Sequence, residues 1–197
     1  SNTGGDNNMA AGFEAMYSNT GGNSNTANGY RALYTNNTGN NNSATGAQAL
    51  YSNTNGIRNT AIGSGALYSN SSSDNNTATG FQSLYNNTGQ QNTAYGSQSL
   101  LSNTTGTRNQ ASGYQALYSN TTGNSNVGGG TQSLFSNLTG SNNTAIGDSA
   151  LYKNNTGNLN NAFGSQALAN NTTGRYNLAI GAYALFASAT ASSNKAI

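Results

Sequence analysis

The sequence predicts an all-β fold, a parallel β-solenoid (β-roll) of 17-residue coils with two short strands in each coil. Three observations predict this fold. A unit of 17 residues, such as residues 143–159, repeats along the whole chain, and a fixed short period usually dictates the architecture. The unit is too short for a pair of helices but holds two strands and two turns. The chain also contains no proline, in agreement with a continuous hydrogen-bonded ladder.

We number the positions of each unit 1 to 17 from its first asparagine. Units start at Asn8, Asn25, Asn42, Asn59, Asn76, Asn92, Asn109, Asn126, Asn143, Asn160 and Asn177. Successive starts are 17 residues apart, except that the unit at Asn76 lacks one turn residue. The chain is therefore one repeat array over residues 1–197, with a partial unit at 1–7, eleven units over 8–193 and a partial unit at 194–197. Repeat arrays normally carry atypical end units, whereas both partial units here match the ordinary repeat. We therefore expect a segment of a longer array, or a subunit whose neighbours cover both ends.

The first predicted strand covers positions 1 to 4, as in residues 143–146. Position 1 is asparagine in every unit, and position 3 is alanine except at Gly128. Asparagines stacked at the coil spacing can form an amide ladder along the axis, as they do in cross-β assemblies. The alternative is that asparagine serves there only as a favourable turn residue. Glycine at position 5 of every unit then permits a bend or a positive φ.

The second predicted strand covers positions 6 to 10, with a small residue at position 8 and leucine at position 9 of nearly every unit. Stacked coils would place these leucines on one another, and each buried leucine contributes about 1.5–3 kcal/mol. The predicted core ladder includes Leu50, Leu67, Leu84, Leu117 and Leu151.

Position 10 is mostly aromatic. Because neighbouring strand residues point to opposite faces, an inward leucine at position 9 predicts an outward aromatic side chain at position 10 and an outward small residue at position 8. A contiguous exposed apolar stripe usually marks an interface. The predicted assembly interface consists of Tyr34, Tyr51, Tyr68, Tyr85, Tyr118, Phe135 and Tyr152. The alternative is a bend near position 9 that brings both the leucine and the aromatic side chain into the core.

Positions 11 to 15 most often read Ser-Asn-x-Thr-Gly, which is turn chemistry. This turn repeats the Asn-x-Ser/Thr pattern of N-glycosylation, and an exposed turn is where such a glycan would attach. The candidate acceptors are Asn36, Asn70, Asn103, Asn120, Asn137, Asn154 and Asn171, with Asn86 one position earlier in the short unit. The alternative is that the turn itself requires asparagine, threonine and glycine.

Composition argues against several classes of function. Charged residues make up 5% of the chain, and its six basic residues occupy scattered repeat positions, so no basic stripe for nucleic acid is expected. No apolar run approaches the roughly 20 residues of a membrane span, so no membrane insertion is expected. The chain has no histidine or cysteine and only four acidic residues. Of these only Asp6 and Glu14 could lie near one another, at different phases of the coil, and the others are spaced too far apart for a paired-carboxylate site. We therefore expect no catalytic, cofactor-binding or metal-binding residues.

The motif Asn-Thr-Ala-Ile-Gly-x-x-Ala-Leu of residues 143–151 resembles the Asn-x-x-Ala-Ile-Gly-x-x-Ala/Ser repeats in the heads of trimeric autotransporter adhesins. It is still more similar to the Asn-Thr-Ala-x-Gly-x-x-Ala-Leu-x-x-Asn-Thr-Thr-Gly repeats of phage-type tail fibres and other long surface fibres. The resemblance covers nearly the whole chain. It implies a left-handed β-roll, three chains around one axis, and an extended fibre or adhesin.

The expected function is therefore that of a structural, non-enzymatic fibre or adhesin segment, extracellular, on a cell surface or on a virion surface. Its expected partners are copies of itself, as a homotrimer or a filament, and a host-surface receptor or glycan. One alternative is an ice-binding β-solenoid, which needs a flat, regular threonine array; the threonine row at position 2 is interrupted, for example at Gln110 and Val127, and the row at position 14 lies in a turn. A receptor-binding tail spike is a further alternative.

Overall fold

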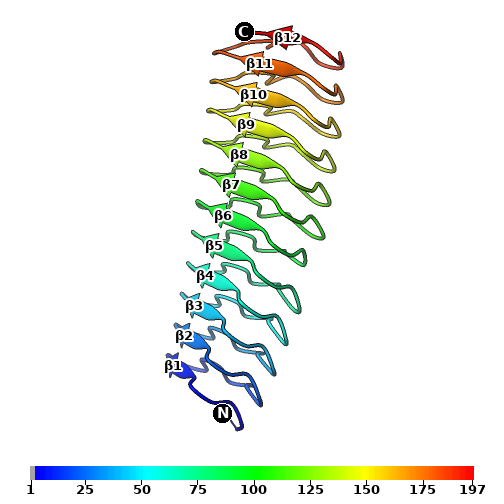
Figure 1. Cartoon of the computed structure of the whole chain (residues 1–197). Coiled ribbons are helices and arrows are strands. Elements are labelled where there is room, and N and C mark those ends of the chain that lie inside the picture. Colours follow the sequence, from blue (N-terminus) through cyan, green and yellow to red (C-terminus); the bar gives the residue numbers. More distant parts are fainter. Residues whose placement is uncertain (1–2) are drawn as a thin grey trace.

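The computed structural model describes residues 3–197 and confirms the parallel β-solenoid. Within that range there is no helix, and twelve short strands form one sheet in sequence order, each parallel to the next. The strands are β1 (Met9–Ala11), β2 (Thr26–Asn28), β3 (Ser43–Thr45), β4 (Thr60–Ile62), β5 (Thr77–Thr79), β6 (Thr93–Tyr95), β7 (Gln110–Ser112), β8 (Val127–Gly129), β9 (Thr144–Ile146), β10 (Asn161–Phe163), β11 (Leu178–Ile180) and β12 (Lys195–Ala196). The coils climb from the N-terminal to the C-terminal end as a thin rod, and the near strands run from right to left, which makes the winding left-handed (Figure 1).

Each coil contains one strand, at positions 2 to 4, and the second strand predicted at positions 6 to 10 is absent from the described residues. That segment cannot be extended, because positions 7 and 9 have positive φ values, as at Gln48 (57°) and Leu50 (52°). It still bonds to its neighbours in the stack. The N–H of Gln48 donates to the carbonyl of Tyr30 in the preceding coil at 2.8 Å, and the N–H of Leu50 donates to the carbonyl of Ala66 in the following coil at 3.0 Å.

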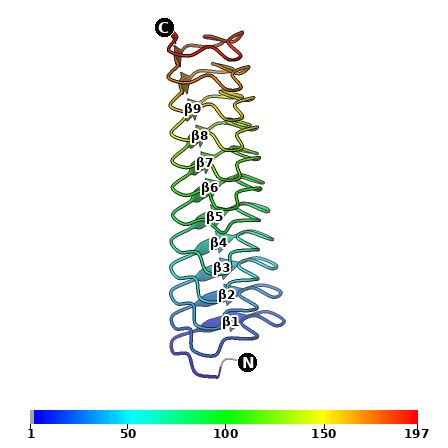
Figure 2. The same ribbon diagram turned by 90° about the vertical axis from the view of Figure 1, so that its right-hand side faces the viewer.

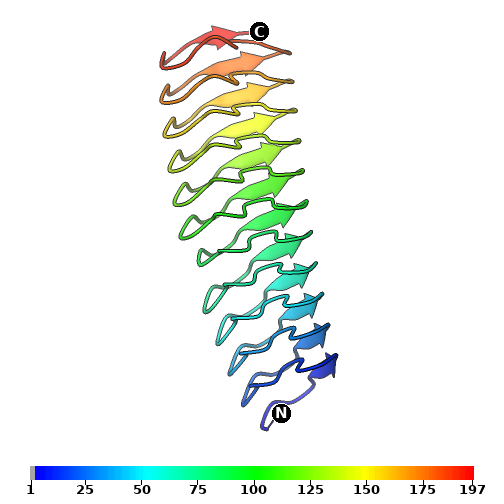
Figure 3. The same cartoon turned by 180° about the vertical axis from the view of Figure 1, so that it is seen from behind.

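The alternating backbone of positions 7 to 9 turns two successive side chains inward. The position-9 leucines from Leu33 to Leu168 are fully buried, which confirms the predicted ladder of Leu50, Leu67, Leu84, Leu117 and Leu151, while Leu185 in the last complete coil is partly buried. The prediction that position 8 faces outward is wrong, because Ala32, Ala49 and Ser83 are also fully buried. The alanine of position 3 completes this narrow core from the strand side, as Ala27 and Ala44 do. Figure 3 shows the strands from behind, beyond the turns that close each coil.

Two buried asparagine ladders flank the core. At position 1, the N–H of Asn109 donates to the Oδ1 atom of Asn92 at 2.9 Å, so the predicted axial ladder is present. At position 12, the Nδ2 atom of Asn120 donates to the Oδ1 atom of Asn103 at 2.7 Å. Both ladders meet at one carbonyl, since Gly123 O accepts from Asn109 Nδ2 at 2.8 Å and from Asn120 Nδ2 at 3.0 Å. The side chains thus replace backbone partners that the turns cannot provide.

Two glycine positions allow neighbouring coils to approach closely. At position 5, Gly63 has a φ of 131°, and a Cβ atom there would lie 2.5 Å from the carbonyl oxygen of Gly80. At position 15, a Cβ atom on Gly106 would lie 2.5 Å from the carbonyl oxygen of Gly123. Any side chain would therefore push the coils apart at these two places. Figure 2 shows the resulting regular stack from the side, with the turns projecting away from the strands.

The unit that starts at Asn76 is one residue short, and the missing residue belongs to the outer turn. Its position-12 asparagine is Asn87, which is buried and donates to the carbonyl of Gly89 at 2.7 Å. The bond spans two residues there, whereas the corresponding bond from Asn120 to Gly123 spans three. The missing residue therefore shortens the outer turn and leaves both asparagine ladders in register.

Candidate interaction surface

The charged side chains of the chain are few, with six basic and four acidic residues. Residues 3–197 include no group of three or more His, Cys, Asp or Glu side chains that could hold a metal ion, and no helix in that range is long and apolar enough to cross a membrane. The salt bridge found there joins Arg31 Nε and Glu14 Oε2 at 2.6 Å. The hydrogen bond that Arg31 donates to the Glu14 carboxylate raises the pKa of Arg31, which stays charged. The outside of the rod carries ordered rows of side chains.

The aromatic side chains of position 10 form a row that we call the ring ladder. Tyr34, Tyr51 and Tyr68 stack almost parallel, with ring centroids 5.1 and 5.0 Å apart and interplanar angles of 2°. The whole predicted interface lies in this ladder, namely Tyr34, Tyr51, Tyr68, Tyr85, Tyr118, Phe135 and Tyr152. The side chains face outward, as predicted, but they are half-buried because each ring covers its neighbours. Aromatic stacking therefore stabilises the rod itself.

Stacking also changes the acidity of the phenols. Burial raises the pKa of Tyr34 and of Tyr68 above the usual value of 10.0, because removing the phenol from water disfavours the phenolate. Neighbouring tyrosines add to this effect at Tyr68, since adjacent phenolates would repel one another. The raised pKa values favour the neutral form of the Tyr34 and Tyr68 phenols.

Two residues interrupt the ring ladder. Leu101 replaces an aromatic residue between Tyr85 and Tyr118, and its branched side chain takes the place of the ring. Ala169 replaces one between Tyr152 and Phe186, and a hollow of about 340 Å³ lies at this second break. The lining residues of the hollow are Gln132, Ser149, Tyr152, Lys153, Gln166, Ala169, Asn170 and Phe186.

A second apolar row runs along the corner at which the strands end. It is built from the large apolar side chains of positions 4 and 6, on either side of the position-5 glycine, and we call it the apolar corner. Its members are Phe13, Tyr30, Ile62, Phe81, Tyr95, Tyr114, Ile146, Phe163 and Ile180. They are more exposed than the ring ladder, with 66% of Phe13, 51% of Phe81 and 50% of Tyr95 accessible to solvent.

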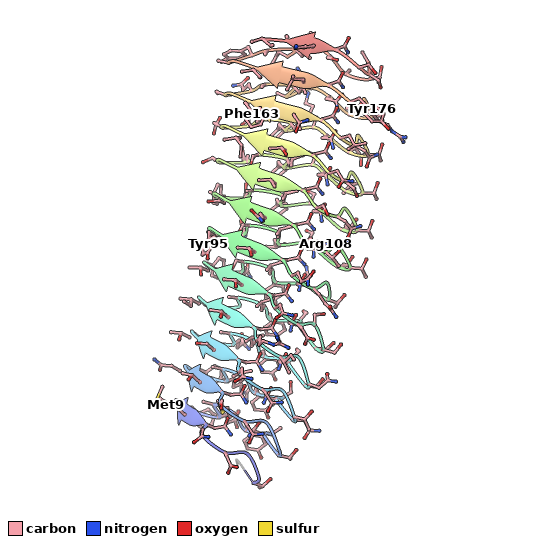
Figure 4. The ribbon with its side chains drawn as sticks, viewed as in Figure 1. Met9, Tyr95, Arg108, Phe163 and Tyr176 are labelled. Atoms are coloured by element: carbon pink, nitrogen blue, oxygen red, sulfur yellow. The ribbon has the colours of Figure 1, made fainter. Side chains whose placement is uncertain are left out.

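The large residue alternates between the two positions of the apolar corner. In the coils that contain it, Tyr95 at position 4 accompanies Ser97 at position 6, whereas Tyr114 at position 6 accompanies Ser112 at position 4. Figure 4 shows Tyr95 and Phe163 projecting from the edge at which the strands end, on the opposite side from Arg108 and Tyr176. The row is not evident from the sequence, because position 4 and position 6, each compared across the units, carry residues of different kinds.

Position 7 connects the two apolar rows. The guanidinium of Arg31 lies 5.0 Å from the ring centroid of Tyr30 at the apolar corner and 5.4 Å from that of Tyr34 in the ring ladder. Farther along, Gln115 Nε2 donates to Gln98 Oε1 at 3.0 Å and begins an amide row along the same line. One side of the rod thus carries the apolar corner, a polar row and the ring ladder side by side.

The candidate glycosylation residues are not exposed, so that part of the interpretation is wrong. Asn36, Asn70, Asn103, Asn120, Asn137, Asn154 and Asn171 are fully buried. Their amide nitrogens already donate hydrogen bonds within the position-12 ladder, as those of Asn36 and Asn154 do at 2.7 Å. A glycan on these atoms would break the ladder and has no space in the folded coil. The turn requires asparagine for its own structure, while the exposed sequon asparagine of the short unit is Asn86.

The described residues thus form a rod with exposed apolar side chains along its length. Comparisons with models of protein families, with curated proteins and with solved structures found no match.

Proposed function

We propose that this chain is a structural, non-enzymatic segment of a surface fibre, extracellular, on a cell surface or on a virion surface, that assembles with copies of itself and acts in attachment. The observation that carries the proposal is the apolar corner, which exposes one large apolar side chain in most coils along the rod. Contiguous apolar surface of this kind is typical of interfaces. Charged residues make up only 5% of the chain, so electrostatic repulsion does little to prevent association between copies of the chain.

The apolar corner is better suited to association than the ring ladder is. Its side chains are mostly exposed, and only Phe13 and Tyr30 among them stack on each other, whereas the side chains of the predicted interface in the ring ladder are half-buried by one another. A row with one large apolar side chain in most coils can pack against the same row of another chain at the common coil spacing of about 4.8 Å. We propose a homotrimer or filament held by the apolar corner, with the ring ladder at its margin. The remaining polar faces are then available to a host-surface receptor or glycan.

The test is the solution mass of the chain and of two triple variants. Tyr95→Ser, Tyr114→Ser and Ile146→Ser together should convert the assembly to monomers, because they remove most of the apolar area from the centre of the corner. Tyr68→Ser, Tyr85→Ser and Tyr118→Ser together should lower the melting temperature and change the solution mass little, because these rings stack within the chain. Thr105→Ser, Thr122→Ser and Thr139→Ser, in exposed turns, form the matched control.

A wild-type chain that is monomeric at micromolar concentration, with a mass unchanged by the corner substitutions, would contradict assembly through the apolar corner. Thermal hysteresis distinguishes the alternative of ice binding, because a fibre segment should show none. Binding of the assembled chain to whole cells, with loss of binding in the monomeric variant, would connect assembly to attachment.

A further inference from the structure

The hollow at Ala169 differs from the rest of the outer surface because it is a vacant place in a regular stack. Aromatic side chains occupy position 10 of the preceding and the following coil, Tyr152 and Phe186, and both line the hollow. Ala169 itself is 5% exposed and forms its floor. At the other break in the ring ladder, Leu101 fills the corresponding place with a larger side chain.

The dimensions of the ring ladder define what fits into this place. Neighbouring rings have centroids 5.1 Å apart and are nearly parallel, as Phe135 and Tyr152 are at an interplanar angle of 6°. Offset-stacked aromatic rings prefer centroid separations of about 4.5–7 Å. Two coils are about 9.6 Å apart along the axis, so one further planar ring can lie between the two flanking positions at the ladder spacing. The volume of about 340 Å³ also suits a single-ring ligand, since small-molecule sites range from about 300 to 1,000 Å³.

Polar groups surround the apolar place on several sides. Lys153 contributes an exposed ammonium group, which is the charged group among the lining residues. The amide row of position 7 also ends here: Gln132 Nε2 donates to Gln115 Oε1 at 3.0 Å, but the next residue in the row is Ser149. Within the described chain, the carbonyl oxygen of the Gln132 side chain accepts no hydrogen bond, and Gln166 lies across the gap. A cation and amide groups thus border a ring-sized apolar space.

We propose that the hollow at Ala169 binds one planar aromatic ring carrying an anionic substituent, a small aromatic carboxylate, stacked on Tyr152 and paired with Lys153. Phe186 borders the ring on the other side, where its own ring meets Tyr183 edge-on at an interplanar angle of 61°. The carboxylate meets the ammonium group at the rim. Because the bound ligand buries little more than one ring, a dissociation constant of about 1 mM is expected. This site does not depend on self-association.

The test uses benzoate, titrated into the whole chain and followed by calorimetry and by saturation-transfer NMR. Benzoate should bind saturably with one site per chain. Benzamide keeps the ring and loses the charge, so it should bind about twofold to fivefold more weakly, as expected for the loss of an exposed ion pair. Cyclohexanecarboxylate keeps the charge but has no planar ring, so it should show no saturable binding.

Substitutions at the two breaks provide matched variants. Ala169→Tyr and Ala169→Leu fill the hollow with residues that position 10 already carries elsewhere, at Tyr152 and Leu101, and both should abolish benzoate binding while the chain stays folded by circular dichroism. Lys153→Gln should reduce benzoate affinity to that of benzamide. Leu101→Ala should open a second ring-sized place between Tyr85 and Tyr118, and so raise the number of benzamide sites from one to two per chain.

Benzoate binding that persists in both folded Ala169 variants would overturn the proposal. So would cyclohexanecarboxylate binding as tightly as benzoate, because the site would then recognise charge alone. A Leu101→Ala chain that folds and binds the same single equivalent of benzamide would overturn the stacking argument.

Discussion

The asparagine residues of the two ladders are as much a part of the interior as the leucines are. Asn109 and Asn120 are fully buried, and their amides both donate to the Gly123 carbonyl. A buried polar group is tolerated because it is hydrogen-bonded, and leaving one without a partner costs about 1–3 kcal/mol. The end of the position-12 ladder illustrates the limit: position 12 of the following coil is Ser188, and the Oδ1 atom of Asn171 is buried without a partner.

At the residue scale, the first prediction concerns Leu117. Leu117→Asp should destabilise the protein by more than about 4 kcal/mol, because it loses packing in the leucine ladder and buries a charge. Thr122→Asp, at an exposed turn position, is the matched control and should change stability by less than about 0.5 kcal/mol. Thermal unfolding followed by circular dichroism measures both. Equal tolerance of the two changes would mean that the position-9 leucines are not the core.

The second residue-scale prediction compares two glycines. Gly106→Ala should cost about 1–3 kcal/mol, because the new methyl group would lie 2.5 Å from the carbonyl oxygen of Gly123 and force the coils apart. Gly21→Ala is the control, since the nearest atom to its new methyl group is the Cγ2 atom of Thr38 at 3.9 Å. Chemical denaturation of both variants provides the comparison. A smaller effect at Gly106 than at Gly21 would contradict the close approach of the coils.

At the scale of the single coil, hydrogen bonds connect neighbours on every side and not only along the strand. Positions 7 and 9 donate to opposite neighbours in the stack, as Gln48 and Leu50 do. Their positive φ costs about 1–2 kcal/mol per residue that is not glycine. Burial of the leucine and alanine side chains and the stacking of position 10 offset this cost. A coil therefore holds its shape because its neighbours repeat it, which is the behaviour expected of repeat proteins.

The ring ladder gives a prediction about alkaline pH. The pKa values of Tyr34 and Tyr68 are raised in the folded chain, so their contribution to stability is fully present below the unfolded value and is lost as pH rises through the folded pKa. Unfolding should therefore become easier above about pH 10. Tyr34→Phe and Tyr68→Phe together should shift alkaline unfolding, followed by circular dichroism, to higher pH. An unchanged midpoint would show that these phenols do not ionise in a buried stack.

At the scale of the whole molecule, the rod is a stack in which each coil contacts its immediate neighbours in sequence. The strand order β1 to β12 contains no crossover, and each strand pairs with the adjacent ones in register. Stability of such an array is approximately a sum of coil and neighbour terms. The apolar corner has members in most coils of this stack, so its effect on assembly should also grow with the number of coils.

Deleting one whole coil tests this description. Removal of residues 109–125 should leave a folded, shorter rod, because unit 126–142 then follows unit 92–108 with every ladder in register. Removal of residues 109–116 should cause extensive unfolding, because it displaces the leucine and asparagine ladders from their counterparts. Hydrogen exchange of the coils distant from the deletion measures the outcome. Similar protection in the two variants would contradict the requirement for register.

The sequence by itself determined the architecture, the core leucines and the axial asparagine row. A strict period means that equivalent residues of each unit lie in equivalent environments. A short unit achieves this when its copies stack in parallel, each on the next. Only the tertiary structure decided the path within the coil. Closing 17 residues around a core of leucine and alanine requires positive φ at positions such as Gln48 and Leu50, so the alternation rule for an extended strand failed at position 8. The same closure buried the sequon asparagines and left the large apolar side chains of positions 4 and 6 on the outside of the rod, on either side of the position-5 glycine.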